Sequence, residues 1–345
     1  MTYKQQEKDL LKVKKLHTGF YIEGKFHHAI EDINLEVKPK EVVCVVGESG
    51  CGKSVMSLSI MQLLPKGISK ISDGEILFNG EDLAKKTEKE MNKVRGRDIA
   101  MIFQEPMTAL NPVFTIGYQL QEVLFNHSNI NKKDARKRAI ELLREVGIPR
   151  AEKIIDEYPH QLSGGMRQRV MIAIAIALHP KLLIADEPTT ALDVTVQAQI
   201  LELLKDIQEK EDMAIMLITH DLGVVADIAD RVIVMYAGQI VEEAKVVDLF
   251  TKPKHPYTEA LLKSIPRMEE VTDKLNTIQG VVPPITNMPE VGCRFVDRCH
   301  KAFDSCKKVS PQLGNVNGDQ HLARCLLYEK CYPSDYSEEK EEISL

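Results

Sequence analysis

The sequence lacks any long hydrophobic run. Its longest uninterrupted apolar stretch, residues 170–178, is far shorter than the roughly 20 residues that a membrane-spanning helix needs. The first residues, MTYKQQEKDLLKVKK, are charged and polar and lack the apolar segment of a signal peptide. We therefore expect a chain without a targeting or membrane-spanning segment, located in the cytoplasm.

The sequence also lacks an excess of positive charge. Its 345 residues include 45 Lys and Arg against 51 Asp and Glu, which gives a formal net charge of −6. A general basic field for nucleic acid is therefore absent. Apolar residues make up 43% of the chain and charged residues 28%, ordinary values that allow a full core and about two domains.

Residues 41–54 predict a phosphate-binding loop. The run EVVCVV is short, β-branched and nearly all apolar, which is typical of a strand buried on both faces. GESGCGKS follows, matches G-x-x-x-x-G-K-[ST] in full and precedes an apolar helical stretch. Backbone N–H groups of such a loop surround phosphate oxygens, its lysine reaches the β- and γ-phosphates, and its hydroxyl binds Mg²⁺. The predicted ATP-binding residues are Gly47, Glu48, Ser49, Gly50, Cys51, Gly52, Lys53 and Ser54.

A second candidate site lies in KLLIADEPTTALD, residues 181–193. Residues 182–185 have the pattern of a buried strand that ends in Asp186 and Glu187. Asp186 suits Mg²⁺ held through water, and Glu187 can act as a base or orient the attacking water. The separation from Lys53 is too long for one βαβ crossover, so a segment is inserted. Further along we predict a helix over residues 189–210, a strand that ends in His220, and a hairpin with Gly238 in its turn.

The class of ATPase is indicated by residues 160–170, HQLSGGMRQRV. Ser163, Gly164 and Gly165 precede a long helical run, so a hydroxyl and backbone donors cap a helix N-terminus. This helix N-terminus is a second anion-binding site, and it would be redundant if it bound the same phosphate as the loop at residues 47–54. LSGGM-R-Q followed by LLIADEPTTALD resembles the signature and Walker B motifs of ABC ATPases, over about residues 10–250.

The resemblance implies an α/β fold. The expected architecture is a P-loop NTPase with a RecA-like ABC ATPase core, an antiparallel β subdomain, an inserted helical subdomain and a small Cys-rich C-terminal extension. The expected domains are the ABC ATPase domain at residues 1–250, with the helical subdomain at about 105–160, and the extension at residues 251–345. By resemblance, the helical subdomain docks on a transmembrane subunit.

The resemblance also implies a head-to-tail dimer. The phosphate loop of one subunit and Ser163, Gly164 and Gly165 of the other enclose each ATP. In this family Gln104 is the Q-loop residue that senses Mg²⁺ and the membrane partner, and Asp193 lies in the D-loop. An aromatic residue near the first strand stacks on adenine, for which Phe20 is favoured over Tyr21.

The implied roles in hydrolysis follow from the same resemblance. The expected catalytic residues are Glu187, Gln104 and His220, the last being the switch histidine near the γ-phosphate. The expected Mg²⁺ ligands are Ser54, Gln104 and Asp186. Since every main motif is intact, we expect an active site.

Four of the seven cysteines form a cluster near the end of the chain: Cys293, Cys299, Cys306 and Cys325. In a reducing compartment such a cluster favours metal or redox chemistry over disulfides. The spacings match neither the common zinc modules nor the ferredoxins, so chemistry alone leaves the metal unspecified. Cys44 and Cys51 are expected to have no ligand role, and Cys331 is expected to be a bystander.

HPYT-x-x-LL and QEPMT-x-LNP resemble the ATPase subunits of oligopeptide/dipeptide-type importers, a group that includes nickel importers. Some members carry a [4Fe–4S] cluster on four cysteines of a C-terminal extension, which GCRFVDRC…SC…ARC resembles. We therefore expect a [4Fe–4S] cluster with a structural role, with zinc or no metal as the alternatives.

The sequence thus predicts an ATPase subunit that powers peptide import. The implied cofactors are ATP and Mg²⁺. The implied partners are a second ABC ATPase subunit, identical or similar, two transmembrane permease subunits and, indirectly, an extracellular solute-binding protein, with the chain peripheral to the cytoplasmic face of the membrane. Nickel or another small solute is an alternative cargo. A soluble ABC ATPase acting on nucleic acid or ribosomes, and a metal or redox sensor, are alternatives of other classes.

Overall fold

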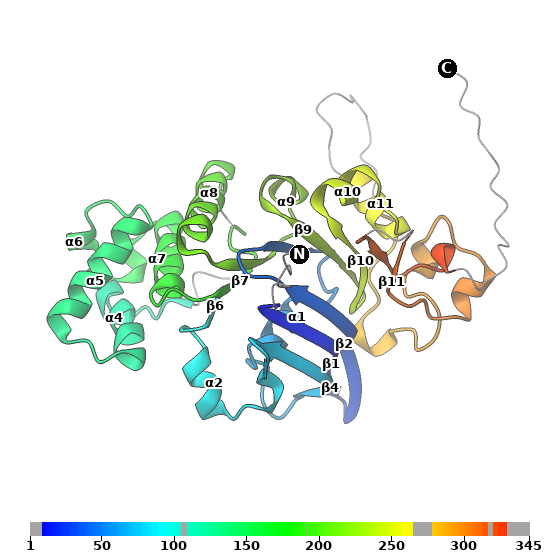
Figure 1. Ribbon diagram of the computed structural model, residues 1–345, viewed down its shortest axis with the longest axis horizontal. Coiled ribbons are helices and arrows are strands. Elements are labelled where there is room, and N and C mark those ends of the chain that lie inside the picture. Colours follow the sequence, from blue (N-terminus) through cyan, green and yellow to red (C-terminus); the bar gives the residue numbers. More distant parts are fainter. Residues whose placement is uncertain (1–8, 105–108, 191, 265–277, 317–319, 330–345) are drawn as a thin grey trace, which may run out of the picture.

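The computed structural model describes residues 9–104, 109–190, 192–264, 278–316 and 320–329. Two β-sheets form its centre, with a group of helices at one end and the last part of the chain at the other (Figure 1). The smaller sheet is antiparallel, in the order β2-β1-β4-β5. Its strands are β1 (Leu11–Ile22), β2 (Lys25–Val37), β4 (Ser69–Phe78) and β5 (Glu81–Asp82).

The larger sheet has the order β11-β12-β10-β9-β3-β8-β7-β6. Strands β9, β3, β8, β7 and β6 run parallel, while β10, β12 and β11 add antiparallel pairs at one edge. The strands are β3 (Val42–Val46), β6 (Ile99–Ile102), β7 (Leu182–Asp186), β8 (Ala214–Ile218), β9 (Arg231–Tyr236), β10 (Gln239–Lys245), β11 (Gly314–Asn315) and β12 (Leu322–Ala323).

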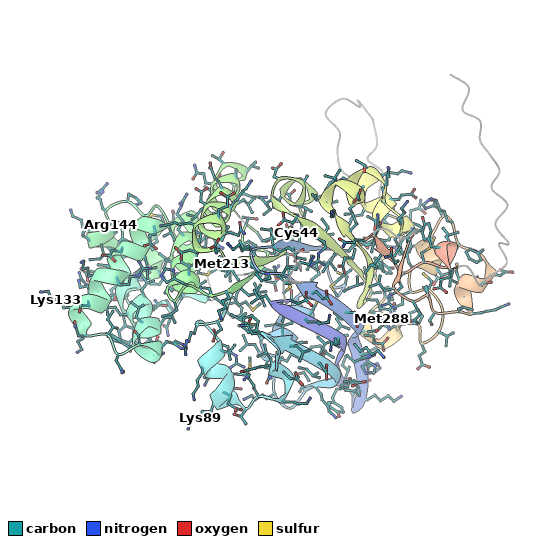
Figure 2. The ribbon with its side chains drawn as sticks, in the orientation of Figure 1. Cys44, Lys89, Lys133, Arg144, Met213 and Met288 are labelled. Carbon is teal, nitrogen blue, oxygen red and sulfur yellow. The ribbon has the colours of Figure 1, made fainter. Side chains whose placement is uncertain are left out.

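The strand β3 shows why its sequence reads as a continuous apolar run. All five of its residues are buried. Val43 and Val45 pack into the core shared with the antiparallel sheet, whereas Cys44 and Val46 pack into the core under the helices. Because successive side chains point to opposite faces, a strand covered on both faces needs apolar residues throughout. Figure 2 labels Cys44 near the middle of the molecule.

The α-helices cover the larger sheet and extend beyond it. They are α1 (Lys53–Ile60), α2 (Glu88–Val94), α4 (Ile116–His127), α5 (Lys132–Glu145), α6 (Ala151–Ile154), α7 (Gly164–Ile176), α8 (Val194–Glu211), α9 (Leu222–Ile228), α10 (Val246–Thr251) and α11 (Pro256–Lys263). Among the described residues, none of the helices is both long and apolar enough to cross a bilayer. The mixed α/β fold expected from the sequence is confirmed by this architecture.

Helices α4, α5 and α6 fall within the residues expected to form the helical subdomain, and they gather at one end of the molecule (Figure 1). Helix α5 is amphipathic, with Ala135, Ala139, Leu142 and Leu143 buried. The helix expected from residue 189 begins instead at Val194, because the Asp193 side chain accepts a hydrogen bond from Val196 N and caps it.

The C-terminal extension is built mostly from short 3₁₀ turns. These are η3 (Ile285–Asn287), η4 (Val296–Arg298), η5 (Asp304–Lys307) and η6 (Leu326–Tyr328); the other two, η1 (Leu83–Lys85) and η2 (Pro159–Gln161), lie earlier in the chain. The extension is fastened to the ATPase core: β12 pairs with β10, and Phe295, 1% exposed, packs with Tyr236 and Tyr257. The sequence did not indicate this joint packing.

Candidate functional site

The phosphate loop lies between β3 and α1, where the sequence predicts it. Its glycines are required by the backbone: Gly47 has φ 150° and Gly52 has φ 102°. A Cβ at Gly47 would come within 2.2 Å of the Met235 carbonyl oxygen, and one at Gly52 within 2.7 Å of an Ile30 methyl group. No other residue type fits both conditions, so the loop can close tightly and direct its N–H groups inward.

Lys53, the first residue of α1, is buried in this loop. Its Nζ donates to the carbonyl oxygens of Gly47 and Glu48, at 2.7 and 3.1 Å. The ammonium group is therefore fixed at the open end of the helix, next to the backbone N–H groups of the loop. Cys51 lies beneath it, fully buried, and burial raises the pKa of its thiol. Its side chain packs in the core shared with the antiparallel sheet.

Asp186 ends β7 directly beside the phosphate loop. Burial raises the pKa of its carboxyl group, while a hydrogen bond from Ser54 acts in the opposite direction. Its Oδ1 is buried and, within the described part of the chain, has no hydrogen-bond partner. A buried carboxylate oxygen without a donor is costly unless a cation is bound nearby. The pair of Ser54 and Asp186 therefore fits a magnesium site.

Glu187 is held at the mouth of the site. Its Oε2 accepts hydrogen bonds from Gln104 Nε2, at 3.0 Å, and from Thr190 Oγ1, at 2.9 Å. His220 Nδ1 lies 3.5 Å from the same oxygen. The structure thus brings together Gln104, Glu187 and His220, three residues far apart in the sequence. Glu187 has φ 47°, an uncommon conformation for a residue with a side chain, and this strained backbone aims the carboxylate.

A cavity of about 510 Å³ joins these parts. The phosphate loop, Gln104 and Glu187 line it on one side. Phe20 and Ile22 from β1 line it further out, whereas Tyr21 is not among the lining residues and is 48% exposed. The geometry therefore favours Phe20 over Tyr21 as the aromatic residue of the site. Residues 282–285 and Met288 of the extension also line this cavity.

The signature segment is formed as expected but lies elsewhere. Ser163 caps α7, and its Oγ accepts from Met166 N at 3.3 Å. Ser163 and Gly164 are exposed, and Gly165 is half-buried. Ser163, Gly164, Gly165 and Asp193 are not among the residues that line the nucleotide cavity of their own chain. Each chain thus carries two anion-binding sites, the phosphate loop and the N-terminus of α7, and only the phosphate loop lines this cavity.

The four extension cysteines line one small cavity. Cys293 N donates to the Cys306 carbonyl oxygen at 2.7 Å, which joins the two loops. Burial raises the pKa of Cys293 to about 11 and that of Cys325 to about 12, and the neighbouring cysteines add to both shifts. Backbone N–H groups of Phe295, Lys301 and Leu327 bond to three of the sulfurs and lower those pKa values. Over the described ranges, no three such side chains come together as the ligands of a single ion do.

Two contacts of the phosphate loop were missed by sequence reasoning. Glu48 N donates to the hydroxyl of Tyr257, a residue of α11, at 2.9 Å. The Glu48 carboxylate makes two hydrogen bonds with Arg298 of the extension, at 2.7 and 3.0 Å. The HPYT segment could have pointed to a buried tyrosine, but no sequence pattern links residue 298 to residue 48. The contact of Thr190 with Glu187 was likewise not predicted, although both residues belong to the DEPTT run.

The chain is similar to known proteins over most of its length. The family described as ABC transporter matches residues 30–190, and the family described as oligopeptide/dipeptide transporter, C-terminal region, matches residues 241–306. The chain is 56% identical over 321 residues to the oligopeptide transport ATP-binding protein AppD of Bacillus subtilis, covering 93% of this chain and 97% of that protein. It is 49% identical to the dipeptide transport ATP-binding protein DppD of the same organism, covering 93% and 95%.

Solved structures show the same fold. The dimeric ATP-binding cassette MJ0796, in a post-hydrolysis state bound to ADP and phosphate, is 30% identical with a TM-score of 0.62 and covers 68% of this chain and 98% of its own. The structure of cbiO1 from Clostridium perfringens, part of the ABC transporter complex cbiONQ, is also 30% identical, with a TM-score of 0.61. It covers 71% of this chain and 92% of its own.

Proposed function

Since the chain belongs to the family of ATP-binding subunits of oligopeptide/dipeptide ABC transporters and is an ATPase that powers peptide import, we propose a role for each residue of its site. The observation that carries the proposal is the meeting of Gln104, Thr190 and His220 at one oxygen of Glu187, beside the phosphate loop. Water held there would lie next to a base, as attack on the γ-phosphate of ATP requires.

In this proposal, Lys53 and the loop N–H groups bind the β- and γ-phosphates of ATP. Glu187 accepts a proton from water as the water oxygen attacks the γ-phosphorus. The bond from that phosphorus to the bridging oxygen breaks, and ADP leaves with the electron pair. His220 orients the γ-phosphate. Ser54, Asp186 and Gln104 would hold Mg²⁺, which neutralises charge on the phosphate oxygens when bound with ATP.

We also propose that the site is completed by a second ATPase subunit. The signature helix N-terminus is exposed and does not serve the cavity of its own chain, and it suits the phosphates of another. The related cassette MJ0796 was solved as a dimer, which supports this arrangement. Asp193, at the N-terminus of α8, would lie near the same interface.

Docking on permease subunits is supported by exposed aromatic residues of the predicted helical subdomain. Phe114 and Tyr118 are 40% and 51% exposed, with ring centroids 4.5 Å apart, and Phe125 and Tyr158 are also exposed. Exposed aromatic rings of this kind mark protein contact sites. We propose that one of two permease subunits binds here and holds the chain at the cytoplasmic face of the membrane, with an extracellular solute-binding protein acting indirectly through the permeases. Residues 105–108 of the segment expected to join this surface to the site lie outside the described residues.

The four extension cysteines are proposed to hold a [4Fe–4S] cluster with a structural role. Four thiols with N–H donors aimed at their sulfurs form a suitable donor set. All four cysteines line one small cavity, which supports a shared metal centre. Iron and sulfide assays and a visible absorption spectrum of anaerobically purified protein test this. One tightly bound zinc per chain without iron would contradict it.

The shared ATP site is tested with Ser163→Tyr. The isolated chain should bind ATP with an unchanged Kd, because the phosphate loop is intact. Hydrolysis by the complex assembled with its permeases should fall about 100-fold, because the bulky ring keeps the second subunit from the phosphates. Ser72→Tyr, at an exposed position of β4, is the control. Undiminished hydrolysis by the Ser163 variant would mean that each chain works alone.

A further inference from the structure

The C-terminal extension reaches the cavity of the phosphate loop. Val282, Pro283, Pro284, Ile285 and Met288 line the same cavity as Phe20, Ala29 and the loop itself. The 3₁₀ turn η3 (Ile285–Asn287) lies against β2. Figure 2 labels Met288 where the extension meets the antiparallel sheet. The segment is therefore placed to touch whatever occupies this cavity.

The residues that line the cavity are of two chemical kinds. The phosphate loop supplies backbone N–H groups and Lys53. Phe20 and Ile22 from β1 and the valine, proline, isoleucine and methionine side chains of the extension supply an apolar lining. Uncharged apolar side chains cannot stabilise phosphate, but they suit the flat, weakly polar face of a base.

Arg298 connects the extension segment to the phosphate loop. Its guanidinium group binds both carboxylate oxygens of Glu48 and also donates to the carbonyl oxygens of Ile278, Gln279 and Gly280, at 3.3, 2.8 and 3.3 Å. The side chain is 6% exposed and lies over the Tyr236 ring at 5.6 Å. Residues 278–280 lead directly into the segment that lines the cavity. The buried guanidinium group of Arg298 thus fixes the distance between the phosphate loop and the segment that lines the cavity.

We propose that residues 282–288 form a wall of the nucleotide site that contacts the base and ribose of ATP, and that Arg298 is a positioning residue that holds this wall in place through Glu48. The proposal rests on the proposed function, since the cavity binds a base only if the adjoining loop binds its phosphates. It assigns the extension a part in the selection of the nucleotide by its own chain.

Comparing ATP with inorganic triphosphate tests the wall, because triphosphate has no base. Equilibrium binding to the purified chain, in the presence of Mg²⁺, is measured for both probes. Ile285→Ser and Met288→Ser together should raise the Kd for ATP about tenfold, which corresponds to the loss of one apolar contact. The Kd for triphosphate should stay within about twofold. Val281→Ser is the matched control, since Val281 is the adjoining residue, is 82% exposed and is not among the residues that line the cavity.

The outcomes separate this inference from the function on which it rests. If the Kd values for ATP and triphosphate rise equally, the segment only supports the fold. If the Kd for ATP is unchanged, the segment does not contact the base. Either result would contradict the proposal that residues 282–288 contact the base. If the unaltered chain binds neither probe, the proposed ATP site itself fails.

The role of Arg298 is tested with a double-mutant cycle. Arg298→Gln and Glu48→Gln should each lower the ratio of ATP to triphosphate affinity about threefold to fivefold. The double variant should lower it no further, because both changes break the same contact. Arg298→Lys, which keeps the charge but loses the fork, should behave like the glutamine variant. Additive effects, or a ratio that stays constant while the melting temperature falls, would reduce Arg298 to a structural contact.

Discussion

The ATPase core and the C-terminal extension are stabilised by different means. In the core, β3, β7 and β8 are buried along their whole length and are joined by parallel pairing. The described part of the extension has helix α11, two short strands and several 3₁₀ turns, and it is attached to the core by arginines. Arg294 binds Glu31 and the Ala237 carbonyl oxygen, Arg298 binds Glu48, and Arg324 binds Asp32 and the Ile240 carbonyl oxygen.

The difference shows how a segment with few apolar residues can still be placed accurately. Apolar burial gives most of the free energy of folding but little direction. A buried guanidinium group contributes less net stability, yet its fixed donors accept only one arrangement of partners. We infer that the core sets the stability of the chain, while arginines and cysteines set the position of the extension.

The largest expected effect lies in the core. Glu187→Gln should keep ATP binding and the closed dimer, because the side chain keeps its size, but lower the rate of hydrolysis by the assembled complex about 100-fold or more. Metal content of the extension should not change. Rapid hydrolysis by this variant, reconstituted with its partners, would remove Glu187 from the mechanism.

A smaller effect, with the opposite pattern, is expected for Cys306→Ser. If the proposed cluster is bound, loss of one thiol should release it and lower the melting temperature by about 5 °C or more, because a metal centre would contribute several kcal/mol to a region with little core of its own. Metal analysis and thermal unfolding measure both. Cys44→Ala in β3 is the matched control: it should keep the metal. Full metal content in the Cys306 variant would exclude this residue as a ligand.

The smallest expected effect concerns the arginine attachments. Arg324 is 3% exposed, and Arg324→Met should lower the free energy of unfolding by about 1–3 kcal/mol, since it leaves the Ile240 carbonyl oxygen and Asp32 without this donor. Arg144→Met should cost less than about 1 kcal/mol, because the bond to Glu152 is exposed at the outer edge of the helices (Figure 2). Urea denaturation compares them. Equal losses would refute the view that buried arginines fasten the extension.

The sequence predicted the core well because local chemistry determines it. The glycines at 47 and 52 are imposed by the backbone of the loop, and the strands before the loop and before Asp186 are apolar throughout because both faces are covered. These features act within a few residues and leave a readable pattern. The roles of Gln104 and His220 came from the resemblance, because a polar loop residue or a histidine at a strand end has no pattern of its own.

The extension was less predictable because contacts between distant residues, and not local patterns, determine its position. Its four cysteines could be grouped by type, and the structure places all four around one cavity. Its attachment depends on contacts between residues about 250 positions apart, such as Arg298 with Glu48, which leave no periodic signal. The line of residues 282–288 along the nucleotide cavity depends on those contacts and was likewise not foreseen.

One pairing in the larger sheet has a further consequence for handling the protein. β12 occupies part of the side of β10 that faces away from β9, through Glu242 and Glu243, and Arg324 N adds a bond to the Val241 carbonyl oxygen. Without the extension, this border of the sheet would present open backbone groups to any other extended chain. Proteolytic removal of β12 would therefore leave this part of β10 unpaired and favour self-association.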